Sequence, residues 1–476
     1  MDFKISSVMI DCDKGKILIP FSDNITFFYG NTGVGKTSLL NLINYALGQD
    51  LILTQIIDEE VRAVCLDVFI CQRRISIERR VDKIKSNLIT VKEENSIRSF
   101  LAKGDSSSRI TFSDYLYEIL GLKPIEMLWG KSTKTVRVTF ANYMWYAYLR
   151  QDELDNTLFY LGVQSGNYKK FASNYVLHVI LDEVKELKKE ILQAINGISE
   201  KQEAVQMKLS IMKEIFSSSS IFEINIGNEI LKKYQMLGQI NQEIEQIFSA
   251  EKMYNEEQVQ NLVRYLKTVG RYEAEIRYLK EFRKISEVKE KYYKLSDVYE
   301  REKKEYQKRM MEIRNESFRE NIKCLEGFLK ESLLDVGFQG FSQEDMVRID
   351  TKSFVPTIYS KTGEFRFDYY NLSSSGIRTI FKICYALSIY RFVKEKKIVS
   401  LLPTFIMIDT PMKNISERID KDIYIKLYEY FYRLFSKGGA LYGIQLIIID
   451  KEAPEVFKKN NVTCRMFTKE KPLVPL

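Results

Sequence analysis

The chain has 476 residues, of which 45% are apolar and 29% are charged. A chain of this length and composition can bury a substantial core and divide into two or three structural units, which excludes a disordered protein. Its 72 basic and 64 acidic residues leave a formal net charge of +8, a mild bias toward polyanions that does not indicate nucleic-acid binding by itself.

Cysteine usage and the N-terminal residues exclude two further classes. The six cysteines lie far apart, form no Cys-x-x-Cys pair, and have one histidine, His178, to assist them, so we expect reduced thiols and no zinc site. The N-terminus has neither a basic nor an apolar leader region, and no uncharged apolar run reaches the ~18 residues of a membrane span. We therefore expect a soluble, cytoplasmic protein.

Residues 1–178 alternate short apolar strands with turns. Apolar residues at helical spacing predict a helix over 37–47 that ends at Gly48, and a second helix with Ser113 as its N-cap that ends near Gly121. Strand-like runs are expected at 3–10, 16–21, 24–29, 61–71, 75–81 and 87–91.

Residues 179–335 contain no proline and are rich in Glu, Lys and Gln, with apolar residues three or four apart. This spacing is typical of a coiled coil, and two such runs predict an antiparallel hairpin with its tip near 250–255 and an arm on the order of 100 Å. Four serines at 217–220 and Gly227 interrupt the outgoing side. A compact helical domain is the alternative.

Residues 336–476 return to short strands and helices, with apolar runs at 403–408 and 443–449. Because the two flanks resemble each other and the middle does not, we expect residues 1–178 and 336–476 to form one α/β domain. Its fold class would be a P-loop head, a mixed sheet with flanking helices, interrupted by the helical hairpin.

A complete P-loop pattern lies between the strand-like run 25–29 and the helix that follows. In such a loop the glycines let backbone N–H groups approach phosphates, Lys36 balances charge on the outer phosphates, and Thr37 offers a hydroxyl to magnesium. The residues predicted to hold the nucleotide are Gly30, Asn31, Thr32, Gly33, Val34, Gly35, Lys36, Thr37 and Ser38.

Three further features accompany the P-loop. The apolar run 405–408 ends in Asp409, the form expected of a second carboxylate on the magnesium side. Gln151 follows the apolar stretch 140–149 in a polar break. A serine-rich segment that precedes the predicted helix 377–394 can hold a phosphate at a helix start, or is a simple N-cap; its residues are Ser373, Ser374, Ser375 and Gly376.

The order of P-loop, Gln-containing loop, coiled-coil insertion, Leu-Ser-x-x-Gly signature and Asp-terminated strand resembles the ABC-type ATPases of the SMC, RecF and RecN group. The resemblance implies ATP and Mg²⁺ as cofactors, with Thr37, Gln151 and Asp409 around the metal and Lys36, Gln151 and Asp409 in catalysis. It also implies that residues 373–376 face the nucleotide of a second subunit, so that two heads dimerise around ATP.

The chain departs from this group at two positions. Thr410 follows Asp409 where most relatives carry a glutamate, and Thr410 cannot act as a general base. Asp450 and Lys451 follow the last predicted core strand where a histidine is usual. Hydrolysis is therefore slow, relies on another carboxylate such as Glu417 or Asp450, or is absent.

The leading functional hypothesis is an ATP-gated clamp or sensor on DNA, similar to the SMC-like ATPases of bacterial anti-phage systems that act with a nuclease or toxin. The alternatives are DNA repair in the manner of RecF or RecN, and a scaffold that binds ATP without turnover and holds an effector protein. Basic residues that would contact DNA phosphates are Arg73, Arg74, Arg79, Arg80, Lys83, Lys85, Lys131, Lys134 and Arg137.

Overall fold

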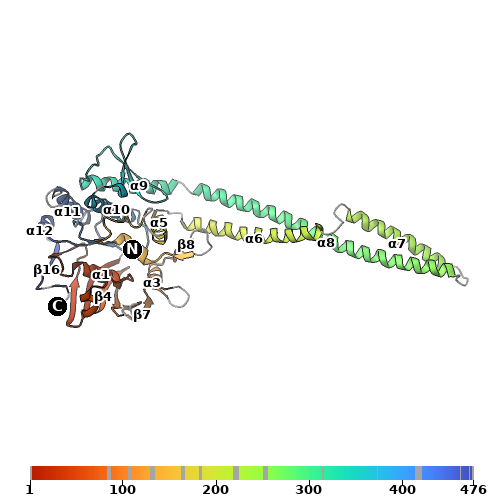
Figure 1. Ribbon diagram of the computed structural model, residues 1–476, viewed down its shortest axis with the longest axis horizontal. Helices are drawn as coiled ribbons and strands as arrows, with labels where there is room; N and C mark the ends of the chain where they lie inside the picture. The colour runs from red at the N-terminus through yellow and green to blue at the C-terminus, as the bar shows by residue number, and fades with distance from the viewer. Residues whose placement is uncertain are drawn as a thin grey trace. The chain divides into compact units, whose positions relative to one another are not determined.

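The computed structural model describes residues 3–82, 87–104, 110–128, 135–161, 167–181, 185–217, 225–249, 256–313, 316–372, 374–412, 421–460, 462–470 and 472–473. The chain divides into two compact units (Figure 1). The first unit is built from both ends of the chain, Met1–Glu183 and Glu316–Leu476, and the second is Val184–Asn315.

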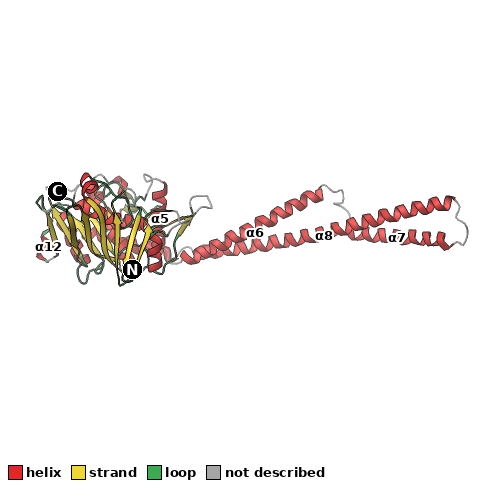
Figure 2. Cartoon of the chain, turned by 90° about the horizontal axis from the view of Figure 1, so that it is seen from below, coloured by secondary structure: helices red, strands yellow, loops and turns green. Residues whose placement is uncertain are grey.

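The first unit contains a five-stranded sheet; the strands of all its sheets are yellow in Figure 2. The described strands of the five-stranded sheet are all parallel, in the order β10-β14-β15-β3-β16. Continuous apolar runs suit such strands, because helices and loops cover both faces of a parallel sheet. The strands are β3 (Ile25–Gly30), β10 (Tyr148–Leu149), β14 (Phe405–Asp409), β15 (Gln445–Ile449) and β16 (Thr463–Phe467).

A separate antiparallel sheet has the order β2-β1-β4-β5-β6-β7. The predicted mixed sheet is therefore two sheets, because strands with alternating burial pair through short hairpins while the wholly apolar strands pair in parallel. Its strands are β1 (Phe3–Cys12), β2 (Gly15–Pro20), β4 (Val61–Ile70), β5 (Arg73–Arg80), β6 (Leu88–Glu93) and β7 (Ser96–Leu101). Smaller sheets pair β8 (Glu126–Leu128) with β9 (Thr135–Arg137), and β11 (Met346–Ile349) with β12 (Pro356–Tyr359) and β13 (Phe365–Asp368).

Buried polar contacts tie the two large sheets together. The Gln445 Nε2 atom donates hydrogen bonds of 2.8 Å to the carbonyl oxygens of Ile5 and Ser22, and Ile5 N donates to Gln445 Oε1 at 3.0 Å. Phe3 N donates to Thr404 Oγ1 at 2.7 Å. Since these bonds join residues about 400 positions apart, the N-terminal and C-terminal parts of the chain belong to one folded body.

The helices of the first unit agree with the predicted positions to within about two residues where helices were predicted. The N-cap of α3 is Thr111, two residues before the predicted Ser113, because Thr111 and Asp114 form a reciprocal capping box. The helices are α1 (Lys36–Ala46), α2 (Gln55–Glu60), α3 (Phe112–Ile119), α4 (Phe140–Ala147), α5 (Asn167–Leu181), α9 (Glu316–Asp335), η1 (Tyr369–Asn371), α10 (Ser375–Glu395), α11 (Lys421–Phe435) and α12 (Glu455–Lys459).

Helix α9 lies in the first unit, although the sequence placed residues up to 335 in the arm. Its buried Ser332 hydroxyl contacts the hydroxyls of Tyr430 at 2.6 Å and Ser388 at 3.2 Å. Its Asn321 Nδ2 donates to Leu181 O at 3.0 Å. Helical spacing of apolar residues looks the same whether a helix packs on a partner helix or on a globular body, which explains the difference of about twenty residues.

The second unit is a helical hairpin, formed by α6 (Lys185–Ser217), α7 (Ile226–Ser249) and the 58-residue α8 (Glu256–Ile313) (Figure 1). Both α6 and α7 pack against α8. Lys233 on α7 pairs with Glu275 on α8, and Lys208 on α6 lies 5.3 Å from the ring centroid of Tyr292. The earlier residue of the outgoing side, Lys208, contacts the later residue of α8, Tyr292, so the pairing is antiparallel, as predicted.

The outgoing side of the hairpin is interrupted, whereas α8 is continuous. Twenty-five residues separate Lys208 from Lys233, but seventeen separate their partners Glu275 and Tyr292. The excess of eight matches the eight residues between Ser217 and Ile226. The predicted tip, 250–255, lies outside the described residues. None of the helices among the described residues meets the length and apolarity needed to cross a bilayer.

Candidate nucleotide-binding site

Glycine conformation shapes the loop between β3 and α1. Gly30 has φ +141°, and a Cβ atom there would lie 2.0 Å from the carbonyl oxygen of Phe467 on the neighbouring strand. Gly35 is the N-cap residue of α1 with φ +91°, and no side chain caps the helix. The open N-terminus of α1 therefore points its first backbone N–H groups toward the loop, the arrangement that binds anions.

The side chain of Lys36 folds back into the P-loop. Its Nζ atom donates hydrogen bonds of 2.7 Å to Gly30 O and 2.8 Å to Asn31 O. Burial lowers the pKa of Lys36, and the carboxylates of Asp450 and Asp409 oppose that effect. The ammonium group is thus partly desolvated beside two acids and next to the helix N-terminus, where a phosphate oxygen would be a stronger acceptor than a carbonyl.

Asp409 ends β14 directly opposite the P-loop. Its side chain is fully buried, and its Oδ1 atom accepts hydrogen bonds from Thr37 Oγ1 at 3.3 Å and Thr410 Oγ1 at 2.8 Å. Its Oδ2 atom is buried without a hydrogen-bond partner among the described residues. Burial raises the pKa of this carboxyl, and the two hydroxyl donors lower it.

The donors around Asp409 fit a divalent cation. Mg²⁺ prefers hard oxygen ligands and uses one or two carboxylates together with substrate phosphates. A threonine hydroxyl and a carboxylate lie in hydrogen-bonding contact here, and the unpartnered Asp409 Oδ2 has capacity for one more interaction. Gln151 follows β10, which pairs with β14 through Leu149 and Ile408, and it lines the same cavity as Thr37.

The cavity in front of the P-loop has a volume of about 320 Å³, which lies within the range of small-molecule sites. Part of its wall was not predicted from the sequence. Leu473 N donates to Val34 O at 3.0 Å, and its buried side chain lies against Gly35. No sequence signal links residues so far apart. The wall residues missed by sequence reasoning are Thr54, Ile56, Ile57, Lys451, Pro472 and Leu473.

Asp450 faces this cavity from the end of β15. Its Oδ2 atom accepts a 2.5 Å hydrogen bond from Tyr428 OH, and its Oδ1 atom accepts one of 2.7 Å from Lys451 N. Burial raises the pKa of Asp450 to about 6, while the two donors act in the opposite direction. Such a carboxylate is ionised at neutral pH and basic enough to take a proton from water.

Thr410 lies between the two carboxylates in an unusual backbone conformation. Its φ is +53°, which is rare for a β-branched residue, and its N–H donates to Ile449 O at 2.8 Å. Its hydroxyl donates to Asp409, so it is held as a hydrogen-bond donor. The other carboxylate considered from the sequence, Glu417, lies outside the described residues.

The described residues of the serine-rich segment form the start of α10. Ser374 is the exposed N-cap of α10 and makes no side-chain capping bond, Ser375 is half-buried, and Gly376 is buried. None of these three residues lines the P-loop cavity. Ser373 lies outside the described residues. The start of α10 is thus a second helix N-terminus without a cap, on another part of the first unit.

Two basic side chains of α10 hold the segment that follows Gln151. Lys382 Nζ donates to Glu153 O at 2.8 Å, and Arg378 Nη1 donates to Asp155 O at 3.2 Å. Burial lowers the pKa of Lys382 to about 8. The sequence analysis did not find either residue, because nothing local distinguishes a lysine that reaches a distant carbonyl.

The basic residues proposed for DNA contact differ in exposure. Arg79 is buried, donates to Tyr45 O and Gln49 O, and stacks on the Tyr45 ring at 3.9 Å, so its assignment as a DNA contact was wrong. Arg137 pairs with Asp114. The exposed members are Arg73, Arg74 and Arg80, and Lys83, Lys85, Lys131 and Lys134 lie outside the described residues.

Comparison with known proteins gives the fold. No protein-family model matches the sequence, and no curated protein matches it. The crystal structure of the Smc head domain with a coiled coil and joint from Pyrococcus yayanosii matches with a TM-score of 0.54 and 13% identity, covering 94% of this chain and 92% of that one. The Smc head domain with an extended coiled coil, bound to the C-terminal domain of ScpA, from Pyrococcus furiosus has a TM-score of 0.41 and 12% identity, covering 96% and 92%. The first comparison confirms the predicted fold, an SMC-type α/β head interrupted by a coiled coil.

Proposed function

We propose that the chain binds ATP with Mg²⁺ at the P-loop and hydrolyses it. The observation that carries the proposal is the meeting of Thr37, from the start of α1, with the buried Asp409 beneath an uncapped helix N-terminus. Residues 30–38 hold the phosphates, and Lys36 balances their charge. Thr37, Asp409 and Gln151 hold the cation, which when bound neutralises charge on the β- and γ-phosphates.

In the proposed reaction a water molecule attacks the γ-phosphorus and the bond to the bridging oxygen of ADP breaks. The proton lost by the water passes to Asp450, and Tyr428 holds that carboxylate in position through its 2.5 Å hydrogen bond. A base with a pKa of about 6 supports modest general-base catalysis near neutrality. Thr410 orients Asp409 and takes no proton.

Two chains complete the site in this proposal. The open N-terminus of α10 carries Ser374, Ser375 and Gly376, none of which lines the P-loop cavity of its own chain, and in this proposal they contact a nucleotide bound by another copy. Two such contacts related by a two-fold axis close a symmetric head dimer. ATP then acts as the bridge between the heads.

We further propose that the dimer is an ATP-gated clamp or sensor on DNA in the cytoplasm. The SMC-type fold, the hairpin of α6, α7 and α8, and the net charge of +8 support this role. A nuclease or toxin partner in bacterial anti-phage defence is proposed on the sequence resemblance, and repair of the RecF or RecN type is the alternative on the same ground.

One experiment tests the ATPase and the clamp together. The purified chain is assayed for ATP turnover, and for duplex DNA binding at rising salt, with Lys36→Ala as the inactive control. We expect turnover that the substitution abolishes, and ATP-dependent DNA binding that weakens steeply with salt because phosphate contacts release counterions. DNA binding that is undetectable with ATP, or insensitive to salt, would contradict the clamp.

A scaffold that binds ATP without turnover is the second candidate. The observation in its favour is Thr410, which occupies the position of the usual base and is held as a donor to Asp409. In that case ATP binding and dimerisation persist in Asp450→Asn, and the wild-type protein shows no turnover. Turnover that depends on Lys36 excludes the scaffold.

A further inference from the structure

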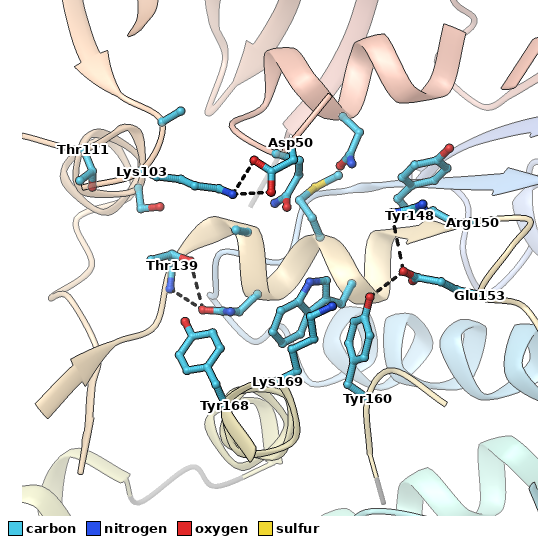
Figure 3. Close-up of a pocket in the computed structure, with 18 of the residues that line it drawn as sticks. Asp50, Lys103, Thr111, Thr139, Tyr148, Arg150, Glu153, Tyr160, Tyr168 and Lys169 are labelled. Atoms are coloured by element: carbon cyan, nitrogen blue, oxygen red, sulfur yellow. Dashed lines mark hydrogen bonds and ion pairs between the residues drawn. The ribbon is translucent and has the colours of Figure 1, made fainter. Parts of the chain in front are cut away.

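A second cavity lies in the first unit, with a volume of about 460 Å³ (Figure 3). It is formed by the end of α1, the start of α3, helix α4, the loop after β10 and the start of α5. It shares no lining residue with the P-loop cavity. Its volume falls within the range of sites that bind small molecules.

One wall of this cavity carries two amides with unmet hydrogen-bonding capacity. Asn44 Oδ1 and Gln49 Nε2 are both buried and have no partner among the described residues. Gln49 N donates to Asn44 O at 3.2 Å, so the two amides come from one turn at the end of α1. Each such atom costs about 1–3 kcal/mol when it is left unpaired, so a ligand that supplies a donor and an acceptor is favoured here.

A second part of the lining is aromatic and cationic. Trp145 and Tyr160 meet edge to face with ring centroids 5.0 Å apart, and Lys169 Nζ lies 4.4 Å from the Tyr160 centroid. In Figure 3, Tyr168 and Lys169 project from one helix toward the cavity that Tyr160 borders. A flat heteroaromatic ring gains most from such surfaces, since it can stack on them.

Backbone strain supports a functional role for this wall. Phe159 and Tyr160 are consecutive non-glycine residues with φ values of +50° and +61°. Tyr160 OH donates to Glu153 Oε1 at 2.6 Å, which fixes the ring at the cavity edge. A strained pair of this kind costs on the order of 1–3 kcal/mol per residue and is typical of ligand clamps.

The cations that line the cavity differ in their partners. Lys103, Arg150 and Lys169 line it together with two carboxylates, Asp50 and Glu153. Lys103 pairs with Asp50 at 2.5 Å, and its side chain is 54% exposed, so it can turn toward a bound phosphate at little cost (Figure 3). Arg150 pairs with Asp152 at 2.8 Å and with Glu153 at 3.6 Å, so among the described residues Lys169 is the lining cation for which no ion pair is formed.

We propose that this cavity binds a nucleotide, with the base between the amide and aromatic walls and the phosphate near Lys103 and Lys169. The ligand is either a free mononucleotide or an unpaired nucleotide of a nucleic-acid strand, since both present the same base and phosphate. The loop after β10 contributes Arg150 and Glu153 to this cavity and Gln151 to the P-loop cavity, so occupancy of one bears on the other. The proposal is independent of ATP hydrolysis.

Tryptophan fluorescence tests the proposal directly. The chain contains two tryptophans, Trp129 and Trp145. The full-length Trp129→Phe, Lys36→Ala protein therefore reports from Trp145 while the P-loop is disabled. It is titrated with AMP, GMP, CMP and UMP in one arm, and with hexamers of each deoxynucleotide in the other. We expect saturable quenching by at least one probe, and the arm that saturates at lower concentration identifies the source.

Variants separate this cavity from binding elsewhere. Asn44→Ala and Gln49→Ala should each weaken binding roughly tenfold through the loss of a buried hydrogen bond. Lys170→Ala, next to Lys169 on α5 but outside the cavity lining, is the matched control and should bind normally. Circular dichroism checks that each variant is folded. The proposal is overturned if no probe saturates up to about 1 mM, an affinity below that of ordinary metabolite sites, or if both alanine variants bind as well as the control.

Discussion

At the scale of single residues, Asp409 is a buried acid of the candidate site with an unsatisfied oxygen atom. Its carboxylate is fully buried, yet its Oδ2 atom lacks a partner and its charge is opposed by burial. Neighbouring Asp450 has a similar environment, but two donors satisfy its oxygens. The two acids therefore suit different tasks, cation binding for Asp409 and proton transfer for Asp450.

The first prediction concerns the cation at Asp409. A non-hydrolysable ATP analogue with Mg²⁺ should raise the melting temperature of the wild-type protein more than the analogue with EDTA. The gain arises because the buried Oδ2 atom acquires a partner, which is worth about 1–3 kcal/mol. Asp409→Asn should remove the Mg²⁺-dependent part of the shift, while the exposed Asp23→Asn should keep it. An equal shift in both carboxamide variants would exclude this site for the metal.

The second prediction concerns the pH dependence of turnover. A base must be ionised to act, so ATPase activity should be low below the Asp450 pKa of about 6 and should rise to a plateau above it. Asp450→Asn should reduce the plateau by about 100-fold or more.

Tyr428→Phe offers a matched variant for this pH profile. Its hydrogen bond lowers the pKa of Asp450, so its loss should move the rising limb to higher pH. A limb that does not move in Tyr428→Phe would assign the ionisation to another group.

Helix α10 connects two parts of the proposed site at the scale of elements. Its N-terminus carries the serine-rich segment, and about one and two turns further its side chains Arg378 and Lys382 hold the carbonyls of Asp155 and Glu153. Gln151 lies two residues before Glu153 and faces the P-loop cavity. Two hydrogen bonds therefore join the first part of α10 to the loop that carries Gln151.

The third prediction uses the buried charge on this helix. Burial lowers the pKa of Lys382 to about 8, against roughly 10.4 in an unfolded chain. Between these values the unfolded chain binds more protons than the folded one, so the contribution of Lys382 to stability rises with pH. Lys382→Met should be more stable than wild type at pH 7.5, and this advantage should shrink by roughly 1–2 kcal/mol between pH 8 and 9.5.

Chemical denaturation of both proteins across this pH range measures the change. Burial also raises the pKa of thiols such as Cys384, so the stability of both proteins falls as pH rises, and that effect cancels in the difference. Lys396→Met, an exposed lysine at the end of the same helix, is the control for the loss of a lysine side chain. A constant difference for Lys382→Met would mean that the lysine carries the same charge in the folded and the unfolded protein over this range, which would contradict a lowered pKa.

At the scale of the whole molecule, the candidate nucleotide site and the helical hairpin belong to different units. The first unit holds the P-loop, both carboxylates and the start of α10, whereas the second is a hairpin of paired helices. The interruption between α6 and α7 affects one side of the hairpin and leaves α8 continuous.

The fourth prediction tests pairing by complementation. Ser374→Arg should block ATP-dependent dimerisation while it preserves nucleotide binding, and Lys36→Ala should abolish both. Neither variant dimerises with itself, so every dimer formed in an equal mixture is mixed and has one intact site, and up to about half of wild-type turnover should return. Light scattering measures dimers, and an ATPase assay measures turnover. If each site were built within one chain, the mixture would stay inactive.

Features that depend on a few neighbouring residues were predictable from the sequence. The P-loop, the strand that ends in Asp409 and the helical spacing of the arm each extend over short segments, where backbone preference and periodicity act locally. The threonine at position 410, in place of the usual glutamate, was equally visible, and it indicated that another carboxylate, such as Asp450, would be needed as a base.

Burial and long-range contacts were decided by the tertiary structure. Arg79 was predicted to be a surface base, but it is buried. Helix α9 was predicted to belong to the arm, but it packs in the first unit. Leu473, from the far end of the chain, forms part of the wall of the P-loop cavity. The cavity between Asn44 and Trp145 had no signature in the sequence at all. The physical reason is that solvent exposure, pKa and unmet hydrogen bonds depend on residues brought together from distant positions, which no local pattern records.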